Sequence, residues 1–467
     1  MLISSVIFYM AFIPQYILIL LALIIIDYTA GRLIASSKGH KRRVYLIISI
    51  LSTCLTLFVF KYFNFFIDNY VDVVRLFHAK STVRHLDIIL PLGLSFHTFQ
   101  SLAYVIEVYR KKQKPEKNFG IYALYVMFYP QLVAGPIERP QNLLHQFYEK
   151  HHFEYERIVS GLRLMLWGVF MKIVIADRLA MIVNYVYKDP TKFEGLPLIV
   201  ATIAFAFQIF CDFAGYSNIA IGAARVMGFN LMKNFNNPYI SRSVQEFWTR
   251  WHISLCTWFR DYVYIPLGGN RVGIPRWAIN IMIVFLLSGL WHGANWTFVI
   301  WGGLNGVYMI IHRFLGKYFY ALADLFFLPK QQTLFKVVQT VTTFSLVTFS
   351  WIFFRAQNLS DALYISTHLF NHLGRDLGGL VNINVNMLLT GIAQKTTVLG
   401  IPAFDLIMVV LAIIGMETIL IKQESVGLKK IFSSKPIFLR WAAYYILIFL
   451  IAYYVTTRQE QFIYFQF

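Results

Sequence analysis

One apolar stretch, from Trp277 to Ile311, sets the strongest limit on how this chain can fold. It contains no Asp, Glu, Lys or Arg. As one continuous helix it would measure roughly 50 Å, well beyond the bilayer core of about 30 Å. The stretch must therefore break or fold back. We predict the break between Ser288 and Asn295, because Gly289 and Gly293 stand on either side of His292 there.

His292 is the first candidate site residue. An ionisable side chain inside a membrane is costly, so it is a functional hypothesis by default, with a polar partner expected nearby. Irregular backbone at that depth is tolerated only where it is buried in protein or lines a cavity. Trp291 and Asn295 flank this position and are candidate supporting residues. The alternative is a structural histidine, hydrogen-bonded within a contact between two helices.

A second histidine, His252, also follows a tryptophan directly. Helical spacing places it on an apolar stripe, opposite a polar stripe that includes Arg250, as in an amphipathic helix at a membrane interface. We expect this helix to end before Pro266, where a turn signal redirects the chain. The alternative is that His252 is a belt residue of an interfacial aromatic helix. The apolar stripe consists of Trp248, His252, Leu255 and Phe259.

The composition indicates an all-α polytopic membrane protein. Of 467 residues, 58% are hydrophobic and only 14% are charged, and apolar runs long enough to span a membrane recur along the chain. We expect about 10–12 transmembrane helices, with re-entrant or interfacial helices, in one integral-membrane domain over residues 1–467. The net charge of +19 gathers between apolar runs and predicts topology, not nucleic-acid binding. The three cysteines support neither a disulfide framework nor a metal site.

The first apolar run, Leu2–Ile26, has no basic residue before it and a basic cluster after it, which predicts a retained first helix with its N-terminus outside. A shorter run, Phe119–Ala134, suits a re-entrant or tilted element. The other expected spans are residues 44–66, 88–108, 158–176, 196–224, 337–354, 401–421 and 437–454.

Asp212 stands inside the predicted span 196–224, and a buried carboxylate needs a cation, a hydroxyl or water beside it. It either supports the site or ties helices together. The stretch from Arg225 to Arg276 is strongly cationic, which predicts a cytoplasmic side. Arg250 and Arg260 are candidates for binding the phosphates of a coenzyme, although such arginines also serve as topology signals.

These residues fit acyl transfer. A desolvated, neutral imidazole such as that of His292 can take a proton from a hydroxyl group that attacks a carbonyl, and His252 could polarise that carbonyl or shuttle the proton. No nucleophile elbow, phosphate loop or metal-binding histidine spacing is present. A transporter with intramembrane histidines is the alternative, but the first half of the chain has no counterpart of the two histidine motifs, which disfavours it.

Several segments closely resemble the membrane-bound O-acyltransferase family, in its bacterial branch of alginate and peptidoglycan O-acetyltransferase membrane subunits. The most specific are EFWTRWHISLCTWFRDYVYIPLGGNR and GLWHGANWTFVIWGGLNG. Others are LPLGLSFHTFQSLAYVIEVYR, YPQLVAGPIERPQNLLHQF and FCDFAGYSNIAIGAARVMGFNL, in the same order as in that branch. The resemblance covers most of the chain.

The resemblance implies a helical fold around a central tunnel, in the inner membrane of a bacterial cell, with His292 as the catalytic residue and His252 as the second signature residue. It implies acetyl-CoA as the donor substrate, with no tightly bound cofactor. It also implies a periplasmic partner, often an SGNH-type acetyltransferase or another acceptor protein, that places the acetyl group on a polysaccharide. A lipid or D-alanyl acyltransferase of the same family is the alternative.

Overall fold

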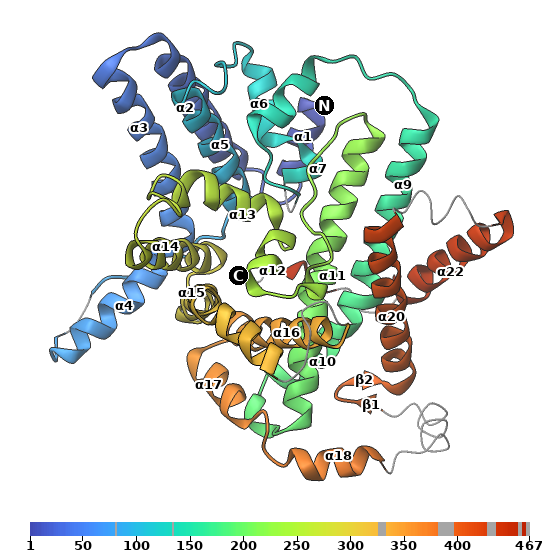
Figure 1. Ribbon diagram of the computed structural model, residues 1–467. Coiled ribbons are helices and arrows are strands. Elements are labelled where there is room, and N and C mark those ends of the chain that lie inside the picture. The colour runs from blue at the N-terminus through green and yellow to red at the C-terminus, as the bar shows by residue number, and fades with distance from the viewer. Residues whose placement is uncertain are drawn as a thin grey trace.

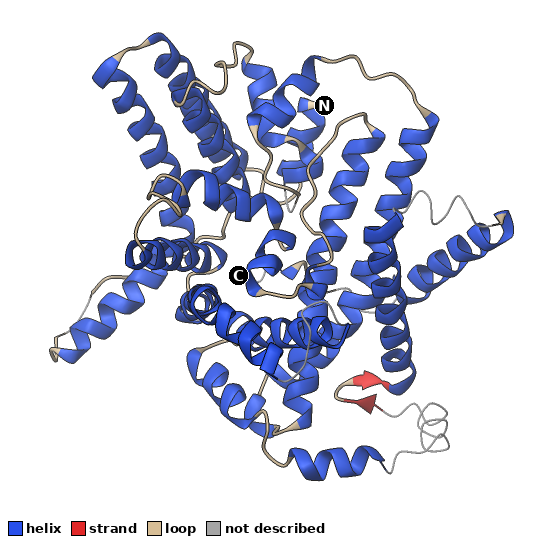
Figure 2. Cartoon of the chain, in the orientation of Figure 1, coloured by secondary structure: helices blue, strands red, loops and turns tan. Residues whose placement is uncertain are grey.

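The computed structural model describes residues 1–79, 82–132, 135–325, 333–381, 397–426, 436–455 and 460–463. Most of the described chain is helical, with one short two-stranded hairpin (Figure 2). Nine helices of this described part are long and apolar enough to cross a membrane. The expectation of an all-α polytopic membrane protein is confirmed.

The N-terminal run is not one span. Helix α1 (Leu2–Met10) ends before Pro14, and α2 (Tyr16–Ser36) starts a new helix that provides the first candidate span. A proline inside a helix removes a hydrogen bond and clashes with the preceding turn, which is why a span over residues 2–26 was wrong. Next, α3 (Gly39–Leu57), the π-helical turn η1 (Phe58–Tyr62) and α4 (Phe63–Leu76) form one long continuous helix.

Two segments expected to enter the membrane give helices shorter than a full span. Residues 88–93 are not helical, because Pro91 and the left-handed Gly93 delay the start of α5 (Leu94–Tyr109), and almost all of α5 is buried. The following run gives α6 (Phe119–Met127) and α7 (Tyr129–Leu132), which are 9 and 4 residues long. The described chain therefore has fewer full spans than the expected 10–12. After them come α8 (Pro140–Leu143) and η2 (Leu144–Tyr148).

The central pair of helices is built on small residues. One long helix consists of α9 (Tyr155–Phe170), the π-helical turn η3 (Met171–Ala176) and α10 (Asp177–Tyr187), and it packs along α11 (Leu196–Val226). A Cβ atom on Gly161 or Gly168 would come within 2.7 Å of a backbone oxygen of α11. Glycines allow membrane helices to approach this closely.

The two histidine segments lie between these groups. They form α12 (Val244–Arg250), α13 (Ile253–Phe259) and the π-helical turn η6 (Arg260–Tyr264), followed by α14 (Ile274–His292) and α15 (Trp296–Leu325). Figure 1 shows α2, α3 and α5 to one side of them and α9 and α11 to the other. Helix α16 (Thr333–Arg355) packs on α15 and α11.

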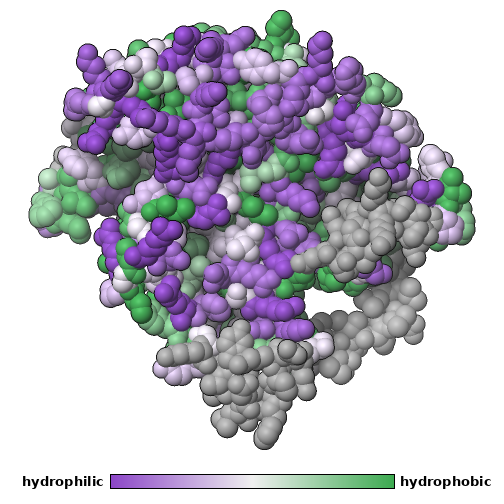
Figure 3. Space-filling view, turned by 45° about the horizontal axis from the view of Figure 1, so that its top comes forward, coloured by the Kyte–Doolittle hydropathy of each residue, from purple (hydrophilic) through white to green (hydrophobic). Residues whose placement is uncertain are grey.

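Most of the remaining elements pack on α10, α11, α16 or η3. They are η4 (Pro190–Lys192), η5 (Pro238–Ile240), α17 (Leu359–His368), α18 (Leu373–Val381), β1 (Thr397–Val398), β2 (Ile401–Pro402), α20 (Ala403–Val426) and α22 (Ile437–Val455). Hydrophilic side chains gather over the end of the molecule where α2 meets α3 and α9 begins (Figure 3). Basic exposed residues such as Lys41 lie there, as expected of a cytoplasmic face.

Candidate active site

The charge-free stretch breaks where its glycines predict. His292 is the last residue of α14, Gly293 follows as its C-cap, and α15 begins at Trp296. The Asn295 side-chain oxygen accepts a hydrogen bond from the Thr297 backbone N–H at 3.0 Å, so Asn295 satisfies an unpaired donor at the start of α15. The predicted helical hairpin is confirmed, and Asn295 is a cap of its second helix.

The His292 side chain is 4% exposed and is enclosed by aromatic rings. Its ring centroid lies 4.8 Å from that of Trp291, 5.0 Å from that of Trp301 and 5.2 Å from that of Phe354. Such surroundings exclude water and disfavour the charged imidazolium form. A neutral imidazole is the form that can accept a proton.

His252 is also buried, at 1% exposed, but it does not lie within one helix. It separates α12 from α13 and adopts a left-handed backbone conformation with φ of 41°. The loop before α12 stabilises this break through Asn234. The Asn234 backbone oxygen accepts a hydrogen bond from Ile253 N (2.9 Å), and its side-chain oxygen accepts one from Ser254 Oγ (2.6 Å). The expectation of a continuous amphipathic helix through His252 was therefore wrong.

Burial determines the protonation state of the His252 side chain. Burial lowers its pKa to about 3, so the imidazole is neutral at any physiological pH. Neither of its ring nitrogens has a hydrogen-bond partner within the described part of the chain. The same holds for three buried polar atoms on the first turns of α5, namely Ser95 Oγ, His97 Nε2 and Thr98 Oγ1. Buried polar groups are normally hydrogen-bonded, so this group of buried atoms without partners beside one another in sequence is unusual.

Trp291 connects the two histidines. Its ring centroid lies 6.1 Å from that of His252 and 4.8 Å from that of His292. On its other side it stacks on Phe99 at 5.3 Å, and Phe99 stacks on Trp258 at 4.0 Å. The indole N–H of Trp291 donates to the backbone oxygen of Ser95 at 3.3 Å. The structure therefore brings His252, Trp291 and His292 together in one aromatic cluster.

A pocket of about 510 Å³ opens beside the end of α14, and we call it the outer pocket. It is lined by the backbone break at Gly293 and Asn295, together with Lys61, Arg355 and Gln357 among others. The Lys61 ammonium donates to the backbone oxygens of Trp291 (2.6 Å) and His292 (3.0 Å). The topology predicted from the basic loops puts this end of α14 on the extracytoplasmic side.

A second pocket of about 700 Å³, the inner pocket, lies beside the residues that precede α14. Its lining includes Arg110, Lys112, Arg139, Asp261 and Tyr262. Tyr262 contacts Trp258 at 5.0 Å between ring centroids, so the aromatic cluster runs from this pocket to His292. The basic residues of its lining lie on the side predicted to be cytoplasmic.

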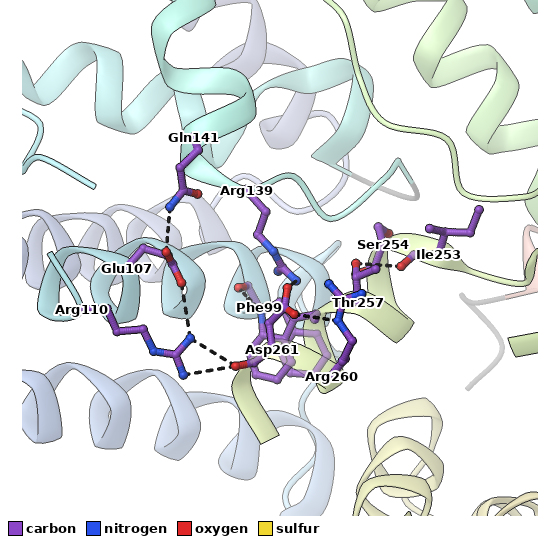
Figure 4. A network of polar contacts seen from close by, with 11 residues as sticks. Phe99, Glu107, Arg110, Arg139, Gln141, Ile253, Ser254, Thr257, Arg260 and Asp261 are labelled. Carbon is purple, nitrogen blue, oxygen red and sulfur yellow. Dashed lines mark hydrogen bonds and ion pairs between the residues drawn. The ribbon is translucent and has the colours of Figure 1, made fainter. Parts of the chain in front are cut away.

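An ionic network holds the wall of the inner pocket (Figure 4). Arg110 donates to the backbone oxygen of Asp261 at 3.2 Å, and the carboxylate of Asp261 pairs with Arg139 at 3.4 Å and with Arg260 at 2.8 Å. Gln141 donates to Glu107 at 2.8 Å. The network fixes these side chains around the pocket before any ligand binds.

The two arginines proposed from the sequence for phosphate binding do not line this pocket. Arg250 pairs with Glu246 of its own helix at 2.8 Å and donates to the backbone oxygen of Asn236. Arg260 borders the pocket only through its ion pair with Asp261. The cationic lining comes instead from Arg110, Lys112 and Arg139, which sequence reasoning counted as topology signals or left aside.

Asp212 has the cation that its burial requires. Lys172 lies 2.8 Å from Asp212 and 2.7 Å from Asp177. A segment near the end of the chain closes the same cluster: the Ile463 backbone N–H donates to Asp212 at 2.8 Å, and the Glu460 backbone oxygen accepts from Lys172 at 3.1 Å. Phe213, the neighbour of Asp212, contacts the His252 ring at 4.5 Å. Asp212 therefore ties helices together directly behind His252.

Sequence reasoning missed Lys61 and Lys172. Lys61 is the one charged residue of the predicted span 44–66, and Lys172 shares the predicted span 158–176 with Arg163. A lysine in such a span is itself a signal of function or of a buried partner, so both could have been found.

Comparisons with known proteins identify the family of this chain. The membrane-bound O-acyltransferase family matches residues 17–356. A probable alginate O-acetylase AlgI of Pseudomonas aeruginosa is 35% identical over 404 residues, which cover 86% of this chain and 74% of that protein. A peptidoglycan O-acetyltransferase of Helicobacter pylori is 32% identical over 421 residues, which cover 83% of this chain and 77% of that protein.

A teichoic acid D-alanyltransferase of Bacillus subtilis is 28% identical over 241 residues, which cover 49% of this chain and 60% of that protein. The family match includes both histidine segments and extends through α16. The chain belongs to the membrane-bound O-acyltransferase family and is an acyl-transferring enzyme of the membrane.

Proposed function

We propose that this enzyme takes an acetyl group from acetyl-CoA on the cytoplasmic side of a bacterial inner membrane and delivers it toward hydroxyl groups of an extracytoplasmic polysaccharide. The observation that carries the proposal is the cluster of His252, Trp291 and His292 between a cationic inner pocket and an outer pocket. The names of the O-acetylating relatives support the acetyl group and the polysaccharide.

In this proposal His292 is the general base. The acceptor oxygen attacks the thioester carbonyl carbon, a C–O bond forms, and the C–S bond breaks. The proton passes from the acceptor hydroxyl to His292 and then to the departing thiolate, so that free coenzyme A leaves as the thiol. His252, which is neutral, donates a hydrogen bond to the carbonyl oxygen as negative charge develops there.

The inner pocket is the proposed donor site. Arg110, Lys112 and Arg139 supply positive charge, and the planar guanidinium groups of arginines suit bidentate binding of phosphate. Tyr262 and Trp258 extend from this pocket toward His292. An acetyl group at the end of a long flexible donor would approach the histidines along these rings while the phosphates stay outside.

The outer pocket is the proposed acceptor site. At about 510 Å³ it falls within the range of small-molecule pockets, roughly 300–1,000 Å³, and so accommodates one side chain or one sugar, not a polymer. This size favours an intermediate acceptor. We propose that a periplasmic SGNH-type protein takes the acetyl group here and passes it to the polysaccharide.

We further propose that residues 1–467 act as one integral-membrane domain. The contacts of residues 460–463 with Lys172 and Asp212 support this, because they join the end of the described chain to its centre.

The test uses purified protein in liposomes, with labelled acetyl-CoA on one side and a soluble hydroxyl acceptor on the other. We expect the label to appear on the acceptor, and His292→Ala to lower the rate by roughly 10²–10⁴-fold, which is what general-base catalysis contributes. Thermal unfolding of the variant in detergent controls for folding.

Three outcomes would contradict the proposal. Full activity of His292→Ala would remove the proposed base. Movement of intact acetyl-CoA without transfer would indicate a transporter. Efficient competition by long-chain or D-alanyl donors, with acetyl-CoA inactive, would indicate another acyl group.

A further inference from the structure

The end of α14 is held by two consecutive residues of the second candidate span. Lys61 donates to the backbone oxygens of Trp291 and His292, and the Tyr62 hydroxyl donates to the backbone oxygen of Leu290 at 3.0 Å. These residues are some 230 positions apart in the sequence. All three hydrogen bonds go to backbone atoms of α14, and the Lys61 ammonium also lies 5.9 Å from the centroid of the Trp291 ring. The contact therefore fixes the backbone at the histidine.

These bonds complete the C-terminus of α14. The last four carbonyl groups of a helix have no partner within it. Here Gly289 accepts from the Gly293 N–H at 3.3 Å, and Lys61 and Tyr62 supply donors to the following three carbonyls. All four carbonyls are thus satisfied at a point where the chain must reverse inside the protein.

The local geometry of the second span makes this clamp possible. Lys61 and Tyr62 close the π-helical turn η1. Successive residues of a regular α-helix point about 100° apart, whereas π-helical turns re-aim side chains and occur frequently at functional sites. The π-helical turn therefore allows the neighbouring side chains of Lys61 and Tyr62 both to reach α14.

The charge of Lys61 also fits this place. Within the described residues no carboxylate lies at ion-pair distance from its ammonium. A cation at a helix C-terminus interacts favourably with the helix dipole. The partial negative charge of the α14 carbonyls therefore stabilises the Lys61 ammonium in place of a carboxylate. The same side chain also lines the outer pocket.

We propose that Lys61 is a positioning residue of the acyl transfer: with Tyr62, it clamps the last carbonyls of α14 and so holds the imidazole of His292 at the angle that proton transfer needs. This proposal rests on the proposed function, in which His292 is the base. A misplacement of about 1 Å can lower a rate by roughly 10²-fold.

The experiment measures kcat, and KM for acetyl-CoA, in the liposome assay for Lys61→Met, Lys61→Arg and Tyr62→Phe. We expect Lys61→Met to lower kcat by ten- to a hundredfold with KM changed less than threefold. Lys61→Arg, whose guanidinium can still donate to two carbonyls, should recover kcat to within about fivefold of the wild type. Arg75→Gln, an exposed change on the same long helix, is the control and should match the wild type.

Equal losses in Lys61→Met and Lys61→Arg, or a raised KM with kcat retained, would overturn the proposal. Should Lys61→Met fail to accumulate, Tyr62→Phe decides, because it removes one hydroxyl only. A severalfold lower kcat supports the clamp, and an unchanged kcat overturns it. His292→Ala in the same assay separates the two proposals: if it is inactive while Lys61→Met is fully active, only the clamp fails.

Discussion

The two histidines differ in how the backbone presents them. His292 ends a long helix, whereas His252 stands in a left-handed turn between two short ones. Such a backbone conformation is uncommon for residues other than glycine, and asparagine and histidine are among those that adopt it most readily. The backbone conformation of His252 therefore sets the direction in which its ring points.

The burial of His252 predicts a pH-dependent stability. Its pKa is about 3 in the folded protein, against an ordinary 6.5, so acid protonates it only in the unfolded state. Stability is full above pH 6.5 and is lost as the pH falls from 6.5 toward 3. One pKa unit is worth about 1.4 kcal/mol, so the wild type should lose about 2 kcal/mol between pH 6.5 and pH 5 through this residue.

The measurement compares thermal unfolding of the wild type and of His252→Asn in detergent at both pH values. Asparagine tolerates the left-handed backbone and does not titrate, so groups that titrate elsewhere cancel in the comparison. The extra loss should be present in the wild type and absent in the variant. An equal loss in both proteins would show that His252 is accessible to protons in the folded state.

At the scale of elements, the sequence predicted the helical hairpin because its cause is local. A charge-free run too long for one span must break, and Gly293 marks the place. The break at His252 was missed because its cause is distant in sequence: Asn234 holds it by hydrogen bonds to Ile253 and Ser254. A helical pattern of apolar residues persists across such a break and does not show it.

In the candidate site, too, features with a local cause could be predicted from the sequence, and features that depend on distant contacts could not. Both histidines and Trp291 could be named from their motifs, and the structure brings all three together. Arg250 and Arg260 could not be assigned from charge alone, because each is paired with a carboxylate beside it. Which arginine faces a pocket depends on packing between segments remote in sequence.

The contact between α14 and α15 predicts a strong difference between two adjacent glycines. A Cβ atom at Gly302 would overlap the backbone oxygen of Phe285, whereas one at Gly303 would meet only the Leu286 side chain, at 3.7 Å. Overpacking typically costs about 1–3 kcal/mol. We expect Gly302→Ala to lose stability by that amount, and Gly303→Ala to lose much less.

Thermal unfolding of the two variants in the same detergent checks this expectation, since both place the same methyl group in α15. Activity should fall with stability for Gly302→Ala, because the hairpin carries His292 at its turn. Equal stability of the two variants would mean that the helices can move apart without penalty.

At the scale of the whole molecule, the cluster around Lys172 joins three parts of the chain. It links η3 and α10 to α11 and to residues 460–463. Removing one partner of a buried ion pair typically costs about 3–5 kcal/mol, because it leaves an uncompensated charge. The cluster therefore contributes strongly to how α10, α11 and residues 460–463 hold together.

We expect Lys172→Met to destabilise the protein by about 3–5 kcal/mol, which limited proteolysis and thermal unfolding in detergent can measure. Adding Asp177→Asn and Asp212→Asn to this variant should recover part of the loss, since no buried charge then remains unpaired. Lys188→Met, an exposed change at the far end of the same long helix, is the control. A wild-type unfolding temperature for Lys172→Met would contradict the structural role of the cluster.

The docking of residues 460–463 also has a consequence for biogenesis. Phe462 and Ile463 are each 1% exposed and lie against α11, yet the ribosome synthesises them after every helix that they touch. While the earlier helices insert, Asp212 lacks the backbone donor that Ile463 later provides. The support behind His252 is thus completed only at a late step of synthesis, so premature termination after α22 would leave an inserted protein whose candidate site lacks this support.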